Sequence, residues 1–147
     1  MKAYKVVRPD KQGRLWSWFY SEDARDALAR ISVRYQPGQY VKPKVKRSRL
    51  MVFRDRADAL AFAHHGNQVW LCEAEDARGV NFGGKKMSAF QVPPWILGLT
   101  RETCARFWQS CTWRRDGRTN ESRLTYDNWP RGTLFAKRVK LLGRVDQ

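Results

Sequence analysis

Cysteines are few in this chain, and their arrangement is uninformative for metal binding. Its 147 residues include three cysteines, and no two of them form a Cys-x-x-Cys pair. A disulfide framework uses an even set of cysteines in an oxidising compartment. The sequence therefore favours a reducing cytoplasm, with the cysteines acting as small buried side chains.

Long apolar runs are missing as well. No stretch approaches the roughly 18 apolar residues that a membrane-spanning helix needs. The segment Met1–Arg8 has no apolar core of the kind found in a secretory signal. We therefore expect a soluble cytoplasmic protein with no membrane partner.

Acidic residues are scarce, so the chain is strongly basic. Fourteen Asp and Glu stand against 29 Lys and Arg, which gives a net charge of +15. Such a surplus repels itself but concentrates polyanions around the protein. Hydrophobic residues make up 42% of the chain, enough to build a core and too many for a disordered basic tail.

The positive charge is concentrated toward the two ends of the sequence. Residues 1–50 contain 13 basic and 4 acidic side chains, residues 51–99 contain 5 of each, and residues 100–147 contain 11 and 5. If the ends meet in the folded protein, they form one basic face.

Local patterns predict an α+β fold in a single domain, residues 1–147, with a mixed or antiparallel sheet and about three short helices. The turn Pro9–Gly13 predicts a hairpin over residues 4–20. Further strands are expected at 31–35, 40–46, 50–53, 68–73 and 134–142, helices at 21–31, 57–65 and 100–111, and loops at 76–88 and 114–120. Asp55 and Asp58 resemble a capping box at the start of the second helix.

The densest basic run is Lys42–Arg49, in which five of eight residues are cationic. In an extended strand, Lys42, Lys44 and Lys46 point to one side, where they can follow a phosphate backbone. The alternative is that lysines on an edge strand prevent aggregation between sheet edges.

Other basic groups strengthen the phosphate interpretation. Two lysines follow Gly83 and Gly84, although the spacing of a phosphate-binding P-loop is absent and a surface loop is the alternative. The residues expected to bind nucleic acid are Lys42, Lys44, Lys46, Arg47, Arg49, Lys85, Lys86, Arg114, Arg115 and Arg118.

Aromatic and catalytic side chains give less direct indications. Trp16, Trp18 and Tyr20 alternate along a strand, so they form either part of the core or a platform on which bases stack.

The adjacent His64 and His65 lack further ligands at metal-binding spacing. No nucleophile and base pair is evident, so we assign no catalytic residue, metal or cofactor.

The order of elements resembles that of the mono-ADP-ribosyltransferase superfamily. A first strand ends in Arg8, the strand Leu50–Phe53 precedes an Ala-rich helix, and Glu121 precedes the segment Pro130–Thr133. This resemblance implies binding and transfer chemistry with NAD through Arg8 and Glu121. The chain departs from the family at the middle motif, where residues 52–54 replace Ser-Thr-Ser or Tyr.

Three functions follow as hypotheses. The first is a non-catalytic protein that binds nucleic acid or a nucleoprotein complex through a basic face. The second is an interaction or inhibitor protein of the phage or mobile-element type, or a virion component, that binds an acidic protein surface. The third is an NAD-dependent transferase, as the resemblance implies.

Overall fold

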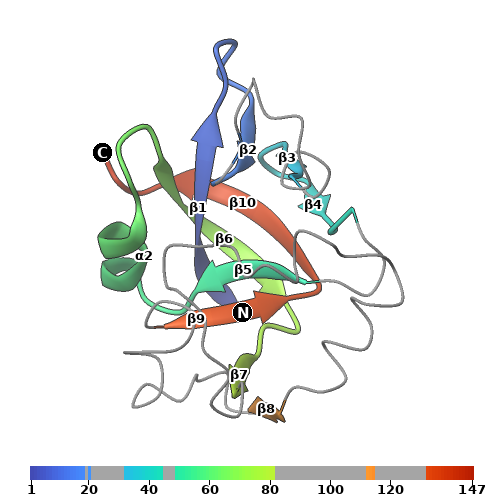
Figure 1. The fold of residues 1–147 in the computed structure, drawn as a ribbon. Helices are drawn as coiled ribbons and strands as arrows, with labels where there is room; N and C mark the ends of the chain where they lie inside the picture. The colour runs from blue at the N-terminus through green and yellow to red at the C-terminus, as the bar shows by residue number, and fades with distance from the viewer. Residues whose placement is uncertain (19, 21–31, 45–48, 82–111, 115–131) are drawn as a thin grey trace.

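The computed structural model describes residues 1–18, 20, 32–44, 49–81, 112–114 and 132–147 (Figure 1). These residues form an eight-stranded sheet, a separate two-stranded sheet and one helix. The elements are β1 Lys2–Pro9, β2 Leu15–Ser17, β3 Arg34–Tyr35, β4 Tyr40–Val41, β5 Leu50–Phe53, α2 Arg56–Phe62, β6 Gln68–Glu75, β7 Gly79–Asn81, β8 Thr112–Arg114, β9 Thr133–Ala136 and β10 Arg138–Arg144.

The large sheet curls toward closure. Its main strand order is β3-β2-β1-β6-β10-β4, and β5 joins β1 to β9. The strands β3 and β4 stand at opposite ends of this order, yet only residues 36–39 separate them in sequence. The backbone N–H of Gly38 donates to the carbonyl of Leu141 on β10 at 2.9 Å. The sheet must therefore bend round until its two ends meet, as in a small barrel.

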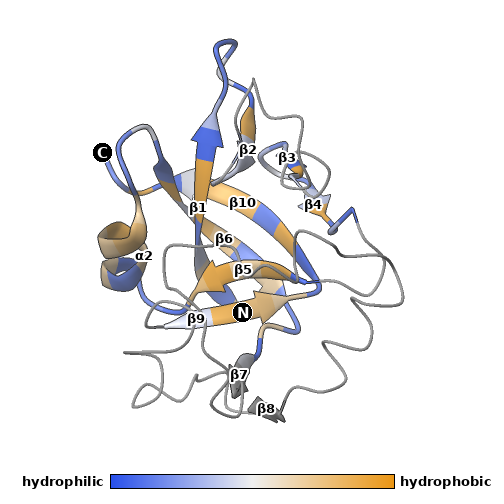
Figure 2. Ribbon diagram, viewed as in Figure 1, coloured by the Kyte–Doolittle hydropathy of each residue, from blue (hydrophilic) through white to orange (hydrophobic). Residues whose placement is uncertain are grey.

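The side chains inside this curve form the main core. Alternate residues of each strand point inward, and the buried cluster draws on β1, β2, β3, β5, β6, β9 and β10. Figure 2 shows this as apolar bands along the strands, with polar residues at the β1–β2 tip. The helix α2 packs against β1 and β5, where Phe62 contacts the ring of Phe53 at 5.2 Å between centroids.

The N-terminal hairpin is confirmed. The antiparallel pairs of β1 and β2 run from Val7 with Ser17 to Pro9 with Leu15. Gly13 has a φ of +80°, a conformation that glycine adopts without steric cost. The second strand ends at Ser17, however, so the expected strand over residues 15–20 is too long.

The helix predicted over residues 57–65 is confirmed but ends earlier, at Phe62. Gly66 has a φ of +88° in the turn that follows. Asp55 is the N-cap residue, as expected, but its side chain makes no capping hydrogen bond, so the predicted capping box is wrong. The other two expected helices, 21–31 and 100–111, lie outside the described residues, and the expected number of helices is not supported.

The structure differs from three further expectations. The strand expected over 40–46 ends at Val41, two residues before Pro43, which has no N–H to donate. The loop expected over 76–88 contains β7, which pairs with β8, a strand that overlaps the loop expected over 114–120 only at Arg114. The expected last strand is divided at Lys137, because β9 pairs with β5 whereas β10 pairs with β6.

Candidate nucleic-acid interface

One group of cations is neutralised by acids at the end of β6. Glu73 binds the N-terminal ammonium at 3.1 Å and Lys2 at 3.3 Å, and Glu75 binds Arg138. These hydrogen bonds lower the pKa of Glu73. The two ends of the chain do meet here, since β1 and β10 both flank β6, but the acids of β6 compensate much of their charge.

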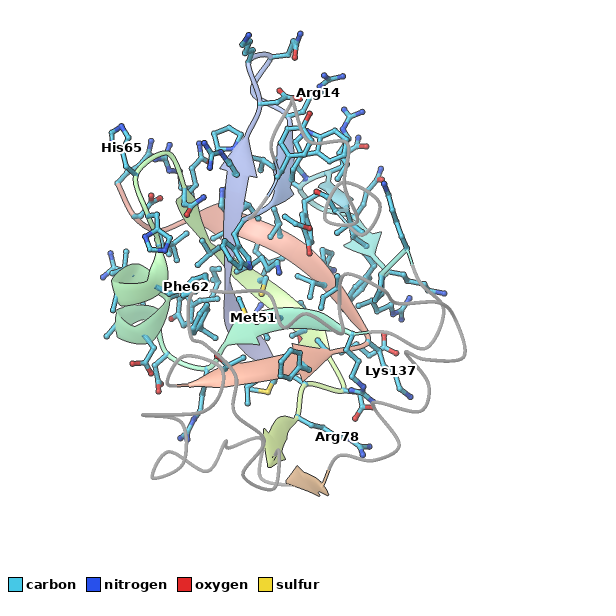
Figure 3. The ribbon with its side chains drawn as sticks, in the orientation of Figure 1. Arg14, Met51, Phe62, His65, Arg78 and Lys137 are labelled. Carbon is cyan, nitrogen blue, oxygen red and sulfur yellow. The ribbon has the colours of Figure 1, made fainter. Side chains whose placement is uncertain are left out.

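Asp76, the residue after β6, forms ion pairs with three more cations. Its carboxylate lies 3.1 Å from Arg49, 2.7 Å from Arg78 and 3.5 Å from Lys137. Partial burial disfavours the charged carboxylate, but hydrogen bonds from Arg78 and Arg49 outweigh burial and lower its pKa. Figure 3 shows Arg78 and Lys137 at the end of the molecule opposite Arg14 and the hairpin tip.

A second group of cations has no ion-pair partner within the described part of the chain. Two of its members, Arg54 and Arg56, lie around the start of α2, where Arg56 donates to the carbonyl of Val145. The other surface members lie on β1, β3 and β10 and just after β4: Arg8, Arg34, Lys42, Lys44 and Lys140. We call these last five the free cations.

Two of the free cations flank a tryptophan across three neighbouring strands. In the sheet register Arg8 lies opposite Trp16, and Trp16 lies opposite Arg34. Directly opposed residues share a face of the sheet, so the three side chains form one row, here called the Arg–Trp row. The ring of Tyr20 stacks on Trp16 with centroids 4.5 Å apart and planes 9° apart.

A single carboxylate fixes the tip next to this row. One oxygen of Asp10 accepts from the backbone N–H groups of Gln12 and Arg14, both at 2.9 Å. The other oxygen accepts from Arg14 Nε at 2.6 Å and from Trp16 Nε1 at 3.0 Å. Burial opposes ionisation of this carboxyl, but these hydrogen bonds outweigh it and lower its pKa to about 2. Asp10 therefore stays charged and holds Trp16 in place.

The other free cations lie around the edge formed by β4 and β10. The guanidinium of Arg138 lies 4.4 Å from the centroid of the Tyr40 ring, and the ammonium of Lys140 lies 4.8 Å from it. Lys42 and Lys44 follow directly in the chain. Cations and an aromatic ring thus meet at this edge as well as in the Arg–Trp row.

The sequence-predicted binding residues are distributed unevenly. Lys42 and Lys44 are free cations, but neither lies in a strand, so the expected alternation of one lysine face does not hold for them. Arg49 is 12% exposed, with its guanidinium bound to Asp76 and to two backbone carbonyls, which is the geometry of a structural ion pair. Arg114 belongs to β8. The remaining six lie outside the described residues: Lys46, Arg47, Lys85, Lys86, Arg115 and Arg118.

The predicted row of three aromatic rings is divided. Trp16 and Tyr20 stack together, whereas Trp18 packs edge-on against Phe62 of α2 with centroids 5.0 Å apart. The strand that would align the three rings ends at Ser17. Neither the core nor the platform interpretation therefore describes the whole set.

A buried lysine lies inside the curl of the sheet. Lys5 is 3% exposed, and its ammonium donates to the carbonyl of Met51 at 2.5 Å. The same ammonium lies 5.3 Å from the centroid of the Tyr35 ring. Burial lowers the pKa of Lys5 to about 8, so the side chain carries most of a positive charge at neutral pH.

Arg34 and Lys5 were not singled out from the sequence. The hairpin register alone could have placed Arg8 opposite Trp16, because the turn is local. Arg34 joins the row only because β3 pairs with β2. That pairing could not be predicted from the sequence, because residues 18–33 separate the two strands.

Comparison with models of protein families, with characterised proteins and with solved structures finds no match. The transferase resemblance therefore stays a prediction. Arg8 is exposed on β1, Val52 and Phe53 are fully buried, and Glu121 lies outside the described residues. Among the described residues, none forms a helix with the length and hydrophobicity of a membrane span.

Proposed function

We propose that this protein binds nucleic acid through its free cations, chiefly those of the Arg–Trp row. The observation that supports this best is the Arg–Trp row, in which two exposed guanidiniums flank an aromatic ring held by Asp10. Each nucleotide of a nucleic acid carries one phosphate and one planar base. Guanidiniums beside an aromatic ring suit this arrangement, because the guanidiniums contact phosphates while the ring lies near a base.

The electrostatics favour the Arg–Trp row over the surface near the end of β6. A cation that already has a carboxylate partner gives little further attraction to a phosphate. Near the end of β6 the cations form ion pairs with Glu73, Glu75 and Asp76. Arg8 and Arg34 have no carboxylate partner among the described residues. Adjacent strands lie about 4.8 Å apart, so Arg8 and Arg34 stand about 10 Å apart across two strand spacings.

A salt titration tests the proposal. If the five free cations contact phosphates of a single strand, log K should fall against log salt with a slope of about −3.5. The measurement is the anisotropy of a labelled oligonucleotide at 50 to 300 mM salt. An association that is undetectable even at low salt would contradict the proposal.

The second hypothesis, an acidic protein partner, requires a separate experiment. Affinity purification from the host, with and without nuclease, separates the two functions. Under the nucleic-acid proposal, nuclease removes the captured material. Tight capture of one acidic protein that survives nuclease would instead favour the interaction protein.

A further inference from the structure

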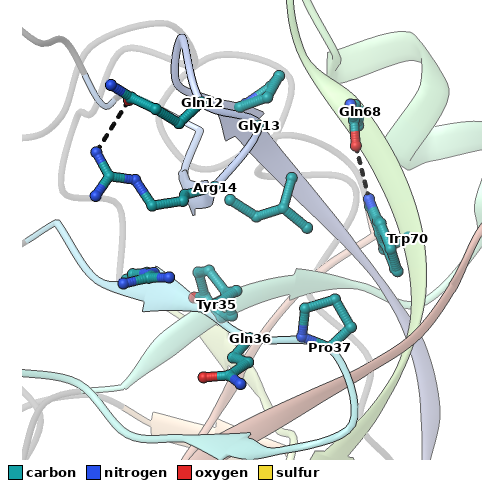
Figure 4. A pocket seen from close by; sticks show the side chains of 11 residues that line it. Gln12, Gly13, Arg14, Tyr35, Gln36, Pro37, Gln68 and Trp70 are labelled. Carbon is teal, nitrogen blue, oxygen red and sulfur yellow. Dashed lines mark hydrogen bonds between the residues drawn. The ribbon is translucent and has the colours of Figure 1, made fainter.

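A cleft opens beside the Arg–Trp row, at the mouth of the curled sheet (Figure 4). Its volume is about 400 Å³, which is within the range of sites for small ligands. It is lined by Pro9, Gln12, Gly13, Arg14, Leu15, Arg34, Tyr35, Gln36, Pro37, Gln68 and Trp70. Strands β2, β3 and β6 contribute the side chains of Leu15, Tyr35 and Trp70, and the adjacent turns contribute Gln12, Gly13, Gln36 and Pro37.

Two glutamines of the cleft are oriented by their neighbours. The carbonyl oxygen of Gln12 accepts from Arg14 Nη2 at 3.1 Å, and that of Gln68 accepts from Trp70 Nε1 at 3.0 Å. Both bonds use the oxygen of the amide, so the NH₂ group of each remains to donate. Together with the two guanidiniums, the cleft offers donors to a ligand rich in acceptors.

The lining of the cleft is cationic. No carboxylate is among its described lining residues, whereas Arg14 and Arg34 are both there. Arg14 is already paired with Asp10 at 2.6 Å, so Arg34 is the lining cation that has no carboxylate partner among the described residues. Below it lies another cation, because Lys5 is directly opposite Trp70 in the register of β1 and β6. A ligand that carries negative charge is therefore favoured over a neutral one.

We propose that this cleft takes one unpaired nucleotide of a single strand, with its base against Trp70 and its phosphate on Arg34. The inference rests on the proposed function, since the cleft shares Arg34 with the Arg–Trp row. Bases combine ring nitrogens and carbonyls with a flat face, which suits amide donors beside an indole. A base inside a duplex is paired and stacked, so it cannot enter without being extruded.

The first test replaces the aromatic wall of the cleft. Trp70→Leu keeps an apolar side chain but removes the stacking surface, so affinity for a single-stranded oligonucleotide should fall roughly tenfold. Affinity for a duplex and the salt slope should stay unchanged. Trp18→Leu is the matched control, because Trp18 packs on Phe62 and does not line the cleft.

A second variant covers the case in which Trp70→Leu fails to fold. Gln68→Glu keeps the oxygen that accepts from Trp70 Nε1 but replaces a donor with a negative charge. Single-strand affinity should fall at least as far as for Trp70→Leu. Gln147→Glu makes the same change of charge at the exposed end of the chain and should have little effect.

The outcomes separate the two proposals. Loss of single-strand affinity in Trp70→Leu or Gln68→Glu, with duplex affinity retained, supports the nucleotide cleft. Unchanged affinity in a folded Gln68→Glu protein that still binds nucleic acid overturns the cleft and leaves the proposed function standing. Failure of the wild-type protein to bind any oligonucleotide overturns both.

Discussion

At the scale of single residues, Asp10 connects the turn to the candidate interface. Its carboxylate accepts four hydrogen bonds, two of which hold the side chains of Arg14 and Trp16. An acid next to a phosphate-binding face would ordinarily weaken binding by repulsion. We infer that Asp10 instead supports binding by holding the side chains of Arg14 and Trp16 in position. Its removal should therefore weaken binding, although it also removes a negative charge.

Asp10→Asn should weaken oligonucleotide binding several-fold, although it raises the net charge from +15 to +16. The amide accepts fewer bonds, so Arg14 and Trp16 are held less firmly. Asp55→Asn raises the net charge equally without touching the hairpin, and its side chain makes no capping bond. Tighter binding by both variants in the anisotropy assay would show that Asp10 contributes only its charge.

Lys5 predicts an unusual dependence of stability on pH. Burial lowers the pKa of Lys5 from 10.5 to about 8 in the folded protein. Between these values the unfolded chain binds this proton and the folded chain does not, so Lys5 makes stability rise with pH. Its contribution is nearly constant below about pH 7, begins to rise around pH 8, and approaches a slope of about 1.4 kcal/mol per pH unit above pH 8.

The check is the difference in unfolding free energy between the wild type and Lys5→Met, measured by urea denaturation from pH 7 to pH 9.5. Groups common to both proteins cancel in this difference. The wild type should gain on the variant by about 1 kcal/mol or more over that range. A difference that does not change with pH would show that Lys5 titrates normally.

At the scale of elements, the sequence predicted what is local. The hairpin follows from its turn, and the strand Leu50–Phe53 and the helix after it follow from their apolar patterns. The curl of the sheet could not be predicted, because it depends on pairing β3 and β4 with opposite ends of one sheet. The division of the last strand at Lys137 also depends on distant partners, since β9 pairs with β5 and β10 pairs with β6.

The glycine just before β9 lies very close to a side chain of α2. Gly132 has a φ of +77°, and a Cβ there would lie 2.5 Å from Asp58 Oδ2 at the start of α2. Gly132→Ala should therefore destabilise the protein by about 2 kcal/mol or more. Gly38→Ala is the matched control, since Gly38 has a φ of +83° with nothing within 4 Å.

Thermal or urea unfolding measures both glycine variants. The control should lose only the cost of the left-handed backbone, about 1 kcal/mol. The additional loss in Gly132→Ala reports the contact with Asp58. Equal losses in the two variants would mean that the segment before β9 shifts freely away from α2.

At the scale of the whole molecule, the composition predicted a basic face but not its position. Lys2, Arg78 and Arg138 contribute to the surplus in the sequence, yet each has a carboxylate partner in the fold. Arg8 and Arg34 look no different in sequence, and they lie free beside Trp16. Which cations are compensated depends on contacts between distant segments, and composition carries no information about those.

The most direct test of the central claim compares two double variants of equal charge. Arg8→Gln with Arg34→Gln, and Arg78→Gln with Lys137→Gln, each lower the net charge from +15 to +13. The first pair should weaken single-strand binding about tenfold in 0.15 M salt and reduce the magnitude of the salt slope by about 1.4. The second pair should leave the slope near the wild-type value, because both residues already bind Asp76. Equal losses in the two proteins would contradict the account, since binding would then follow net charge and not the Arg–Trp row.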